Sequence, residues 1–379
     1  MSSIQISEFE KLAAVARRSL PRMLDPATGL YAHKSIPTEH GFENLGVNAL
    51  YSAASVIGLL SDEEGQYGVE PTLGKTLDSL VAMLDDGASG SLLGTTLWAL
   101  TLAEDRRRVH LVDAIRRGFR TEIASSMDNG LALAGLATAL ERCPELRDHC
   151  YAAAASTAEE LRRRLASRAS LFRGAVRAAS RSILYGGLTS FASQVYAIHG
   201  LAILARATGT AVAPEARLAA ERLVELQGGL GQWWWFYATR TEAVLEGYPV
   251  YSVHQDGMAF MALATLQNLG EGSFSSALWL GLEWVNGKNE LAASLVDRES
   301  DLVFRCIQRV GSDPDAFGGI SRANRTALLL ASFGVRPTFG GPLQPERLEI
   351  LRECRSYHLG WLLYARSLVH RWSNGQDFQ

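Results

Sequence analysis

Closely spaced cysteine pairs, which build zinc ribbons and disulfide frameworks, are absent from this sequence. Its 379 residues include four cysteines, Cys143, Cys150, Cys306 and Cys354, and none belongs to a CxxC pair. We expect reduced and mostly buried thiols. The sequence also lacks HExxH, P-loop, GxGxxG and GxSxG segments. It therefore gives no sign of a metal site or a nucleotide site, and we predict no cofactor.

A strong charge of one sign and long apolar runs are absent as well. The chain carries 37 Lys and Arg against 40 Asp and Glu, a net charge of −3, which gives little electrostatic reason to bind nucleic acid or an anionic membrane. No apolar run reaches the roughly 18 residues of a membrane span. The N-terminus, MSSIQISEFEKLAAVARR, is typical of an amphipathic helix rather than a signal peptide. We expect a cytoplasmic protein with no membrane span, and the sequence leaves its oligomeric state open.

What the sequence does contain is helical periodicity. Apolar residues recur every three or four positions in segment after segment. Helices are predicted over 7–23, 44–60, 73–84, 90–104, 107–120, 130–142, 146–167, 189–206, 214–227, 253–268, 273–286, 321–333 and 346–369. Alternation typical of strands is nearly absent. The main exception is 302–310, which is either a short hairpin strand or an irregular loop.

About a dozen helices joined by short loops, with no linker and no strict repeat, predict helical hairpins packed side by side. We expect an all-α fold in one domain spanning 1–379. The closed arrangement that suits six hairpins is an α/α toroid. Its inner helices surround a funnel, its outer helices cover them, and loops at one end carry the site.

The stretch 229–263 gathers aromatic rings beside hydrogen-bonding groups. Side chains in an extended segment alternate between two sides, so Trp233, Trp235 and Tyr237 would face one way. These rings are candidates for stacking on a sugar or for enclosing a cation. Tyr248 and Tyr251 follow in a Tyr-Pro-Val-Tyr turn and are further binding candidates. The alternative is that all these rings belong to the core.

A helix is predicted to start just after this turn, with Ser252 as a candidate N-cap. His254, Gln255 and Asp256 then lie in its first turn, where side chains project at the helix mouth. We predict proton transfer by His254 and Asp256, with Gln255 binding the ligand. Asp256 also suits the positive end of a helix, so a capping role is the alternative.

Glu242 and Glu246 are a possible pair of catalytic carboxylates, since acid and base carboxylates cleave glycosidic bonds. Their alternative is a solvated loop. Arg305 and Arg309 are candidates for holding a carboxylate, because guanidinium groups pair well with planar anions. Other polar candidates for substrate binding lie in loops or near predicted helix starts: His33, Glu39, His40, Gln194, Asn289, Tyr357 and His358.

Two resemblances bear on function. The segment QGGLGQW, with Gln227, Gly231 and Trp233, resembles the QW motif of squalene–hopene and related terpenoid cyclases, although their DxDD-type acid motif is absent. The segments DPATGLYAHK, YPVYSVHQDGMA and WVNGKNEL resemble the sugar-binding mouth of six-hairpin carbohydrate enzymes: glycosidases, unsaturated-uronide hydrolases and N-acylglucosamine 2-epimerases. Both resemblances imply an α/α toroid. The second implies acid–base residues around an aromatic platform.

The leading hypothesis is a carbohydrate-active enzyme, of hydrolase, lyase or epimerase type, that acts on a small-molecule or oligosaccharide substrate. One alternative is a terpenoid cyclase or prenyltransferase-like protein in which the aromatic rings stabilise a carbocation. Another is a toroid that binds a glycan or a protein without turnover. Fold alone does not choose among these hypotheses.

Overall fold

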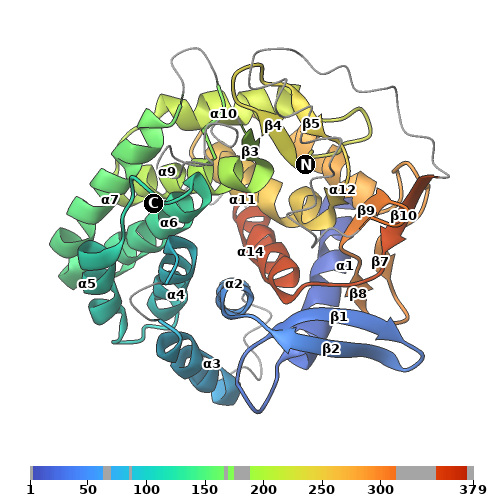
Figure 1. Ribbon diagram of the computed structural model, residues 1–379, viewed down its shortest axis with the longest axis horizontal. Helices are drawn as coiled ribbons and strands as arrows, with labels where there is room; N and C mark the ends of the chain where they lie inside the picture. The colour runs from blue at the N-terminus through green and yellow to red at the C-terminus, as the bar shows by residue number, and fades with distance from the viewer. Residues whose placement is uncertain are drawn as a thin grey trace.

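The protein is a closed ring of helices in two layers (Figure 1). The computed structural model describes residues 3–62, 70–84, 88–165, 170–174, 188–312 and 347–373. In the inner layer each helix contacts the next and the last contacts the first. Its members are α2 (Ala49–Ser61), α4 (Gly90–Leu102), α6 (Ser126–Arg142), α9 (Phe191–Thr208), α11 (Ala259–Asn268) and α14 (Ser356–Ser373).

The outer layer covers this ring with α1 (Ser3–Ser19), α3 (Glu70–Ala82), α5 (Arg108–Gly118), α7 (Arg147–Arg163), α10 (Pro214–Glu225) and α12 (Ser275–Val285). The inner and outer helices differ in how many of their residues are buried. From Asn129 to Leu140 every residue of α6 is buried, whereas α5 buries only Leu111, Val112 and Ile115. Helices that are apolar all round are shielded on every side, and amphipathic helices face water. The predicted α/α toroid is confirmed.

The inner helices run in one direction. Residues near the starts of α2, α6, α9 and α14 line one cavity, and residues near the ends of α2, α4, α6, α9 and α14 line another. The partially negative helix ends therefore converge at the second cavity. Arg142, Arg206 and Arg371 lie there, each in the last turn of its helix. The positive charge of these arginines offsets the partial negative charge of the helix ends. Their position is therefore explained without any ligand.

Glycine lets the inner helices cross closely. A Cβ added to Gly58 of α2 would lie 2.1 Å from the Gly360 carbonyl oxygen of α14. The same close approach occurs between Gly94 and Gly135, where α4 meets α6. Backbone thus packs directly on backbone around the ring, and no side chain at these positions fits without moving a helix.

We expect Gly58→Ala to destabilise the protein by about 1–3 kcal/mol or more, because the new methyl group forces α2 away from α14. Gly74 in α3 is the matched control, since no described atom lies within 4 Å of an added Cβ there. Gly74→Ala should stabilise by about 0.5–1 kcal/mol through helix propensity alone. Urea unfolding measures both. Equal effects of the two substitutions would contradict the close crossing.

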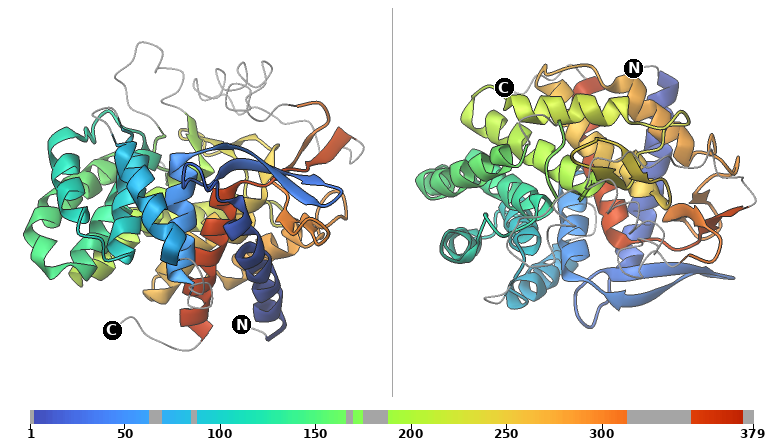
Figure 2. Two further views of the ribbon diagram at one scale, coloured as in Figure 1. Left: turned by 90° about the horizontal axis from the view of Figure 1, so that it is seen from below. Right: turned by 45° about the horizontal axis from the view of Figure 1, so that its top comes forward.

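Short strands lie outside the ring of helices, most of them towards one end of it (Figure 2). Their bounds are β1 (Ala32–Thr38), β2 (Gly41–Val47), β3 (Leu188–Ser190), β4 (Phe236–Ala238), β5 (Val244–Glu246), β6 (Val250–Tyr251), β7 (Val296–Asp297), β8 (Leu302–Val303), β9 (Cys306–Arg309) and β10 (Leu348–Leu351). They form antiparallel sheets in the orders β1-β2, β10-β9-β6, β3-β4-β5 and β7-β8.

The near absence of alternation in the sequence did not reveal these short strands. The hairpin β1–β2 exposes or half-exposes most side chains on both faces, so it carries no apolar alternation for a sequence pattern to detect. The helix predicted over 44–60 begins only at Ala49, and the first part of the helix predicted over 346–369 is strand β10. Short strands do occur in 302–310, as one alternative had it. The helix predicted over 321–333 lies outside the described residues.

No helix in the described part of the chain is both long and apolar enough to cross a membrane.

Candidate active site

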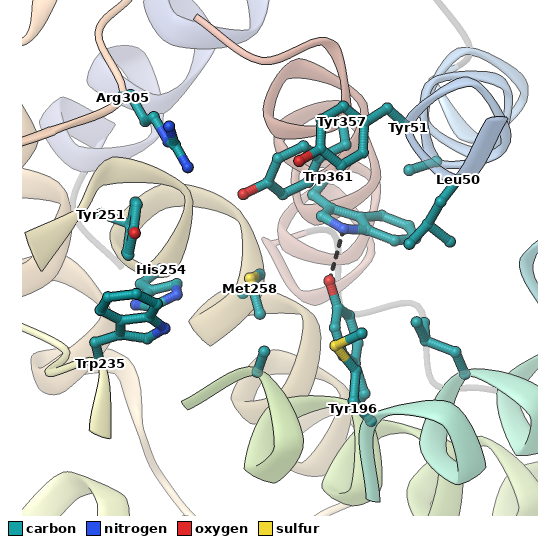
Figure 3. Close-up of a pocket in the computed structure, with 14 residues that line it drawn as sticks. Leu50, Tyr51, Tyr196, Trp235, Tyr251, His254, Met258, Arg305, Tyr357 and Trp361 are labelled. Carbon is teal, nitrogen blue, oxygen red and sulfur yellow. Dashed lines mark hydrogen bonds between the residues drawn. The ribbon is translucent and has the colours of Figure 1, made fainter. Parts of the chain in front are cut away.

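A cavity of about 300 Å³ opens where the inner helices begin (Figure 3). Loops and helix starts from most of the chain supply its walls. It is lined by Leu50, Tyr51, Ala54, Met127, Leu131, Ala192, Tyr196, Trp235, Tyr251, His254, Met258, Arg305, Tyr357 and Trp361. The volume is at the lower end for small-molecule sites.

Most of the polar groups that line the cavity belong to aromatic side chains. Arg305, Tyr251, His254 and Trp235 lie on one side, and Tyr51, Tyr357, Trp361 and Tyr196 lie on the other (Figure 3). The Trp361 indole N–H donates to the Tyr196 hydroxyl at 2.9 Å. Burial raises the pKa of Tyr196 and that of Tyr357. These phenols therefore stay protonated at neutral pH and remain available as hydrogen-bond donors.

His254 enters the cavity from η3 (His254–Met258), a single turn of π-helix that precedes α11. Such turns are frequent at functional sites. The His254 ring packs against Phe191 and Tyr251, with centroid distances of 4.7 and 5.2 Å. Its Nδ1 lies 3.5 Å from the Trp233 carbonyl oxygen, which can only accept. In the tautomer that donates to this carbonyl, Nδ1 carries the hydrogen and Nε2 carries the lone pair.

Burial lowers the pKa of His254 to about 3, so its imidazole is neutral across the physiological range. The nearby charge on His358 lowers that pKa further. The neutral imidazole keeps a lone pair that can accept a proton, but its low pKa makes it a weak base until a negative charge lies beside it, since bases work best near the pH at which they operate.

Asp256 belongs to the same π-turn but points away from the cavity to His358 of α14. Both carboxylate oxygens contact His358 Nε2, at 2.8 and 2.9 Å, and both side chains are buried. Burial by itself would lower the pKa of His358, but the charge and the hydrogen bond of Asp256 outweigh it and raise the pKa to about 10. The pair is therefore an imidazolium–carboxylate ion pair that holds the π-turn against α14.

Arg305 is held at the mouth by its backbone and its side chain. Its carbonyl accepts from the Ser252 N–H at 2.9 Å and from the Ser252 hydroxyl at 2.9 Å. Ser252 thus anchors this loop rather than capping a helix. Arg305 Nη1 donates to Glu353 Oε1 at 2.6 Å, and its guanidinium lies 5.4 Å from the centre of the Tyr251 ring. Glu353 also accepts from Nη2 of the fully buried Arg355 at 2.7 Å.

Of the aromatic residues predicted to bind substrate, Trp235, Tyr251 and Tyr357 reach the cavity. Trp233 and Tyr237 are fully buried in the core, where Trp233 packs on Phe191 with a centroid distance of 5.6 Å. The alternation assumed for an extended strand does not hold at Trp233, because β4 begins only at Phe236. The Tyr248 hydroxyl donates to Glu290 at 2.5 Å, and neither residue lines the cavity.

The predicted amides have structural partners. Gln255 Oε1 accepts from the Trp233 N–H at 3.1 Å, and Gln194 Nε2 donates to the Phe172 carbonyl at 2.7 Å. Asn289 Nδ2 donates to the Trp284 carbonyl at 2.8 Å. In the QW-like segment, Gln227 Nε2 donates to the carbonyls of Gly231 and Ala277 at 3.0 and 2.9 Å, which joins the end of α10 to α12.

Four of the remaining charged candidates do not line the cavity: Glu39, His40, Glu242 and Arg309. Glu242 pairs with Arg222 at 2.8 Å. The backbone of Glu246, in β5, pairs with Phe236 of β4. Glu39 and His40 occupy the exposed β1–β2 turn, and Arg309 is exposed on β9. His33 is half-buried at the rim, where its ring stacks on Tyr51 at a centroid distance of 5.4 Å.

Several residues around the cavity were not candidates from the sequence: Tyr51, Trp361, Glu353 and Arg355. Tyr51 and Trp361 lie in the first two turns of their helices, and so does Tyr357. An aromatic residue early in an apolar helix is the one signal that would have found them. Glu353 and Arg355 lie within the helix predicted over 346–369, so the loop that carries them was not predicted.

No Asp or Glu is among the 14 residues that line this cavity in the described part of the chain. No group of three or more His, Cys, Asp or Glu side chains is placed to hold a metal ion, again within the described ranges. The groups available for chemistry are therefore one neutral imidazole, one guanidinium and several phenols.

No family model matches the sequence. No curated protein matches it either. Among solved structures, the unsaturated glucuronyl hydrolase of Bacillus sp. GL1, described as responsible for the degradation of glycosaminoglycan, is similar with a TM-score of 0.57 at 14% identity, covering 97% of this chain and 96% of that one.

A possible member of the GH105 family from Salmonella enterica has a TM-score of 0.58 at 7% identity, covering 97% and 95% of the two chains. The GH76A alpha-1,6-mannanase of Salegentibacter sp. HEL1_6 has a TM-score of 0.54 at 11% identity, covering 96% and 99%. These neighbours are carbohydrate-active enzymes, and at such low identity the likeness extends to the fold: the chain is a six-hairpin α/α toroid.

Proposed function

We propose that this protein is a carbohydrate-active enzyme that binds a uronic acid unit and removes the proton next to its carboxylate, as lyases and epimerases do. The observation that carries the proposal is the neutral His254 in one aromatic cavity with Arg305 and no carboxylate among the described lining residues. The fold shared with carbohydrate enzymes supports the substrate class.

Substrate binding would combine stacking on aromatic rings with charge pairing to the uronate carboxylate. Trp235 and Trp361 offer faces for the apolar side of a sugar ring. Arg305 would pair with the uronate carboxylate at the mouth. The starts of α2, α6, α9 and α14 meet at this cavity, and the partial positive charge of helix N-termini favours an anion there.

In the reaction, His254 Nε2 takes the proton from the carbon that bears the carboxylate, and the bond pair moves into the carboxylate to give an enolate. Arg305 stabilises the negative charge that develops there. In a lyase, this pair then forms a carbon–carbon double bond as the neighbouring C–O bond breaks, and a phenol such as Tyr357 protonates the leaving oxygen. In an epimerase, the phenol instead returns a proton to the carbon from the opposite face.

A hydrolase is supported less well. Most glycosidases place two carboxylates on either side of the bond that they cleave. Asp256 is engaged by His358, and Glu242 by Arg222, both away from the cavity. Acid–base chemistry by imidazole and phenol needs no carboxylate, so it fits the described lining better.

The test is a thermal-shift screen with glucuronate, galacturonate, glucose and prenyl diphosphates. At a hundred times its dissociation constant, a ligand specific for the folded state adds about 2.7 kcal/mol of stability. We expect a shift with the uronates and none with glucose. Arg305→Gln should abolish the shift, and Arg309→Gln should keep it because Arg309 lies outside the cavity.

A second candidate function has one observation in its favour. Apart from His254 and Arg305, the lining is aromatic, aliphatic or thioether. Such walls also suit an isoprenoid chain or a carbocation. A shift with the prenyl diphosphates alone would replace the uronate proposal with a terpenoid one.

A further inference from the structure

Part of the cavity wall is apolar, and it lies across the ring from Arg305. It is built by the first two turns of three inner helices, α2, α6 and α9. Its side chains, which we call the apolar wall, are Leu50, Ala54, Met127, Leu131 and Ala192. Arg305 precedes β9, which lies on the opposite side of the ring from α6 and α9 (Figure 1). A sugar hydroxyl that faced the apolar wall would lose its hydrogen bonds to water and gain no partner from these side chains.

The Tyr196 hydroxyl lies beside the apolar wall with a hydrogen to donate. Tyr196 follows Ala192 by one turn of α9 and is only 6% exposed. Its oxygen accepts from the Trp361 indole N–H at 2.9 Å (Figure 3). Within the described ranges, no residue accepts the hydrogen of the Tyr196 hydroxyl itself. A buried donor without an acceptor is costly, so a ligand that brings an acceptor to this point gains affinity.

An acyl group combines the two properties that this side of the cavity requires. Its carbonyl oxygen accepts a hydrogen bond, and its alkyl end needs no polar partner. The position of such a group on the sugar follows from Arg305 and Tyr196, which lie on different sides of the cavity (Figure 3). In a six-membered uronate ring, carbon 5 bears the carboxylate and carbon 2 is the ring carbon opposite to it. A uronate whose carboxylate pairs with Arg305 therefore presents carbon 2 to Tyr196.

We propose that the substrate is a uronate acylated at carbon 2, through nitrogen or oxygen, whose acyl carbonyl accepts from the Tyr196 hydroxyl and whose alkyl end packs on the apolar wall. Tyr196 and the apolar wall then determine specificity and take no part in proton transfer. The cavity of about 300 Å³ has room for a small acyl group, such as acetyl, beside one sugar ring. The inference rests on the proposed function, because it takes the carboxylate to be bound by Arg305.

Calorimetric titration with galacturonate and with its 2-acetamido-2-deoxy and 2-O-acetyl derivatives tests the acyl site. Wild-type protein should bind an acetylated form at least tenfold more tightly than galacturonate, and the larger gain identifies the linkage. Tyr196→Phe should lose most of this gain and keep its affinity for galacturonate within a few-fold. Tyr364→Phe is the matched control, because Tyr364 is also a buried phenol but does not line this cavity, and it should keep the full gain.

Ala192→Leu tests the apolar wall without removing a hydrogen bond. Ala192 is half-buried and lines the cavity, so the larger side chain occupies the space assigned to the acyl group. Affinity for the acetylated forms should fall at least tenfold, and affinity for galacturonate should change far less. Circular dichroism and thermal unfolding show whether both cavity variants are folded.

The outcomes separate the acyl site from the proposed function. If galacturonate binds as tightly as its acetylated forms, the acyl site is overturned and the proposed function stands. If Tyr196→Phe weakens all three ligands equally, the hydroxyl acts on a part that they share, and the acyl site is again overturned. If 2-acetamido-2-deoxygalactose, which lacks the carboxylate, binds as tightly as the corresponding uronate, the proposed function fails and the acylated uronate fails with it.

Discussion

Asp256→Asn is expected to destabilise the protein by about 3–5 kcal/mol at neutral pH, the usual cost of removing one partner from a buried ion pair. The substitution leaves the buried His358 imidazolium without its carboxylate. The imidazole then gives up its proton and loses the contact that fixes the π-turn against α14. Urea unfolding measures the loss.

The pH dependence of this contribution follows from the raised pKa of His358. An unfolded histidine titrates near 6.5, and His358 in the folded protein titrates at about 10. The folded state therefore binds more protons between these values, and its stability from this pair is fully present below pH 6.5 and lost as the pH rises through about 10.

Asp256→Asn should remove this alkaline decline. His358→Gln and the double variant complete the cycle, and the double variant should cost far less than the sum of the two single changes. A loss below 1 kcal/mol in Asp256→Asn, or an unchanged decline above pH 6.5, would show that the ion pair does not hold the turn.

His254→Gln is expected to lower kcat by about 10²–10⁴ on the uronide that the ligand screen identifies, because it removes the base. Gln keeps a hydrogen-bond donor for the Trp233 carbonyl, so the fold should survive. His199→Gln is the matched control. His199 is also buried, with a pKa lowered to about 3, but it lies deeper in the ring against the Met261 carbonyl at 2.9 Å.

We expect His199→Gln to reduce stability and to leave kcat within a few-fold of the wild type. Circular dichroism and thermal unfolding show whether each variant is folded, and initial rates at saturating substrate give kcat. If both variants lose activity to the same degree, the role assigned to His254 is structural.

The toroid could be predicted because helical periodicity depends on the local spacing of apolar residues, which the sequence alone contains. The site was harder to predict because its pairs are distant. Asp256 and His358 were both candidates, but they are 102 residues apart in the chain, and no sequence pattern joins them. Trp233 and Trp235 were predicted to face the same way, but the backbone before Phe236 is not a strand, so the two rings do not share a side.

The loop before α14 and the hairpin β1–β2 matched neither the helical nor the strand pattern of apolar residues. The loop that carries Glu353 and Arg355 follows a strand of four residues, too short to interrupt an apolar periodicity that continues into α14. Most side chains of the hairpin β1–β2 are exposed or half-exposed on both faces, so its sequence carries no apolar alternation. Short strands and rim residues are fixed by tertiary contacts rather than by local propensity.

The central claim is that His254 takes a proton from the carbon next to a uronate carboxylate. Incubation of the protein with an oligogalacturonide in deuterated water, followed by mass spectrometry and proton NMR, tests it directly. An epimerase should place deuterium at that carbon and invert it, a lyase should form a carbon–carbon double bond that absorbs in the ultraviolet, and His254→Gln should do neither. Hydrolysis to saturated products, with no deuterium on carbon and with full activity in His254→Gln, would contradict the account.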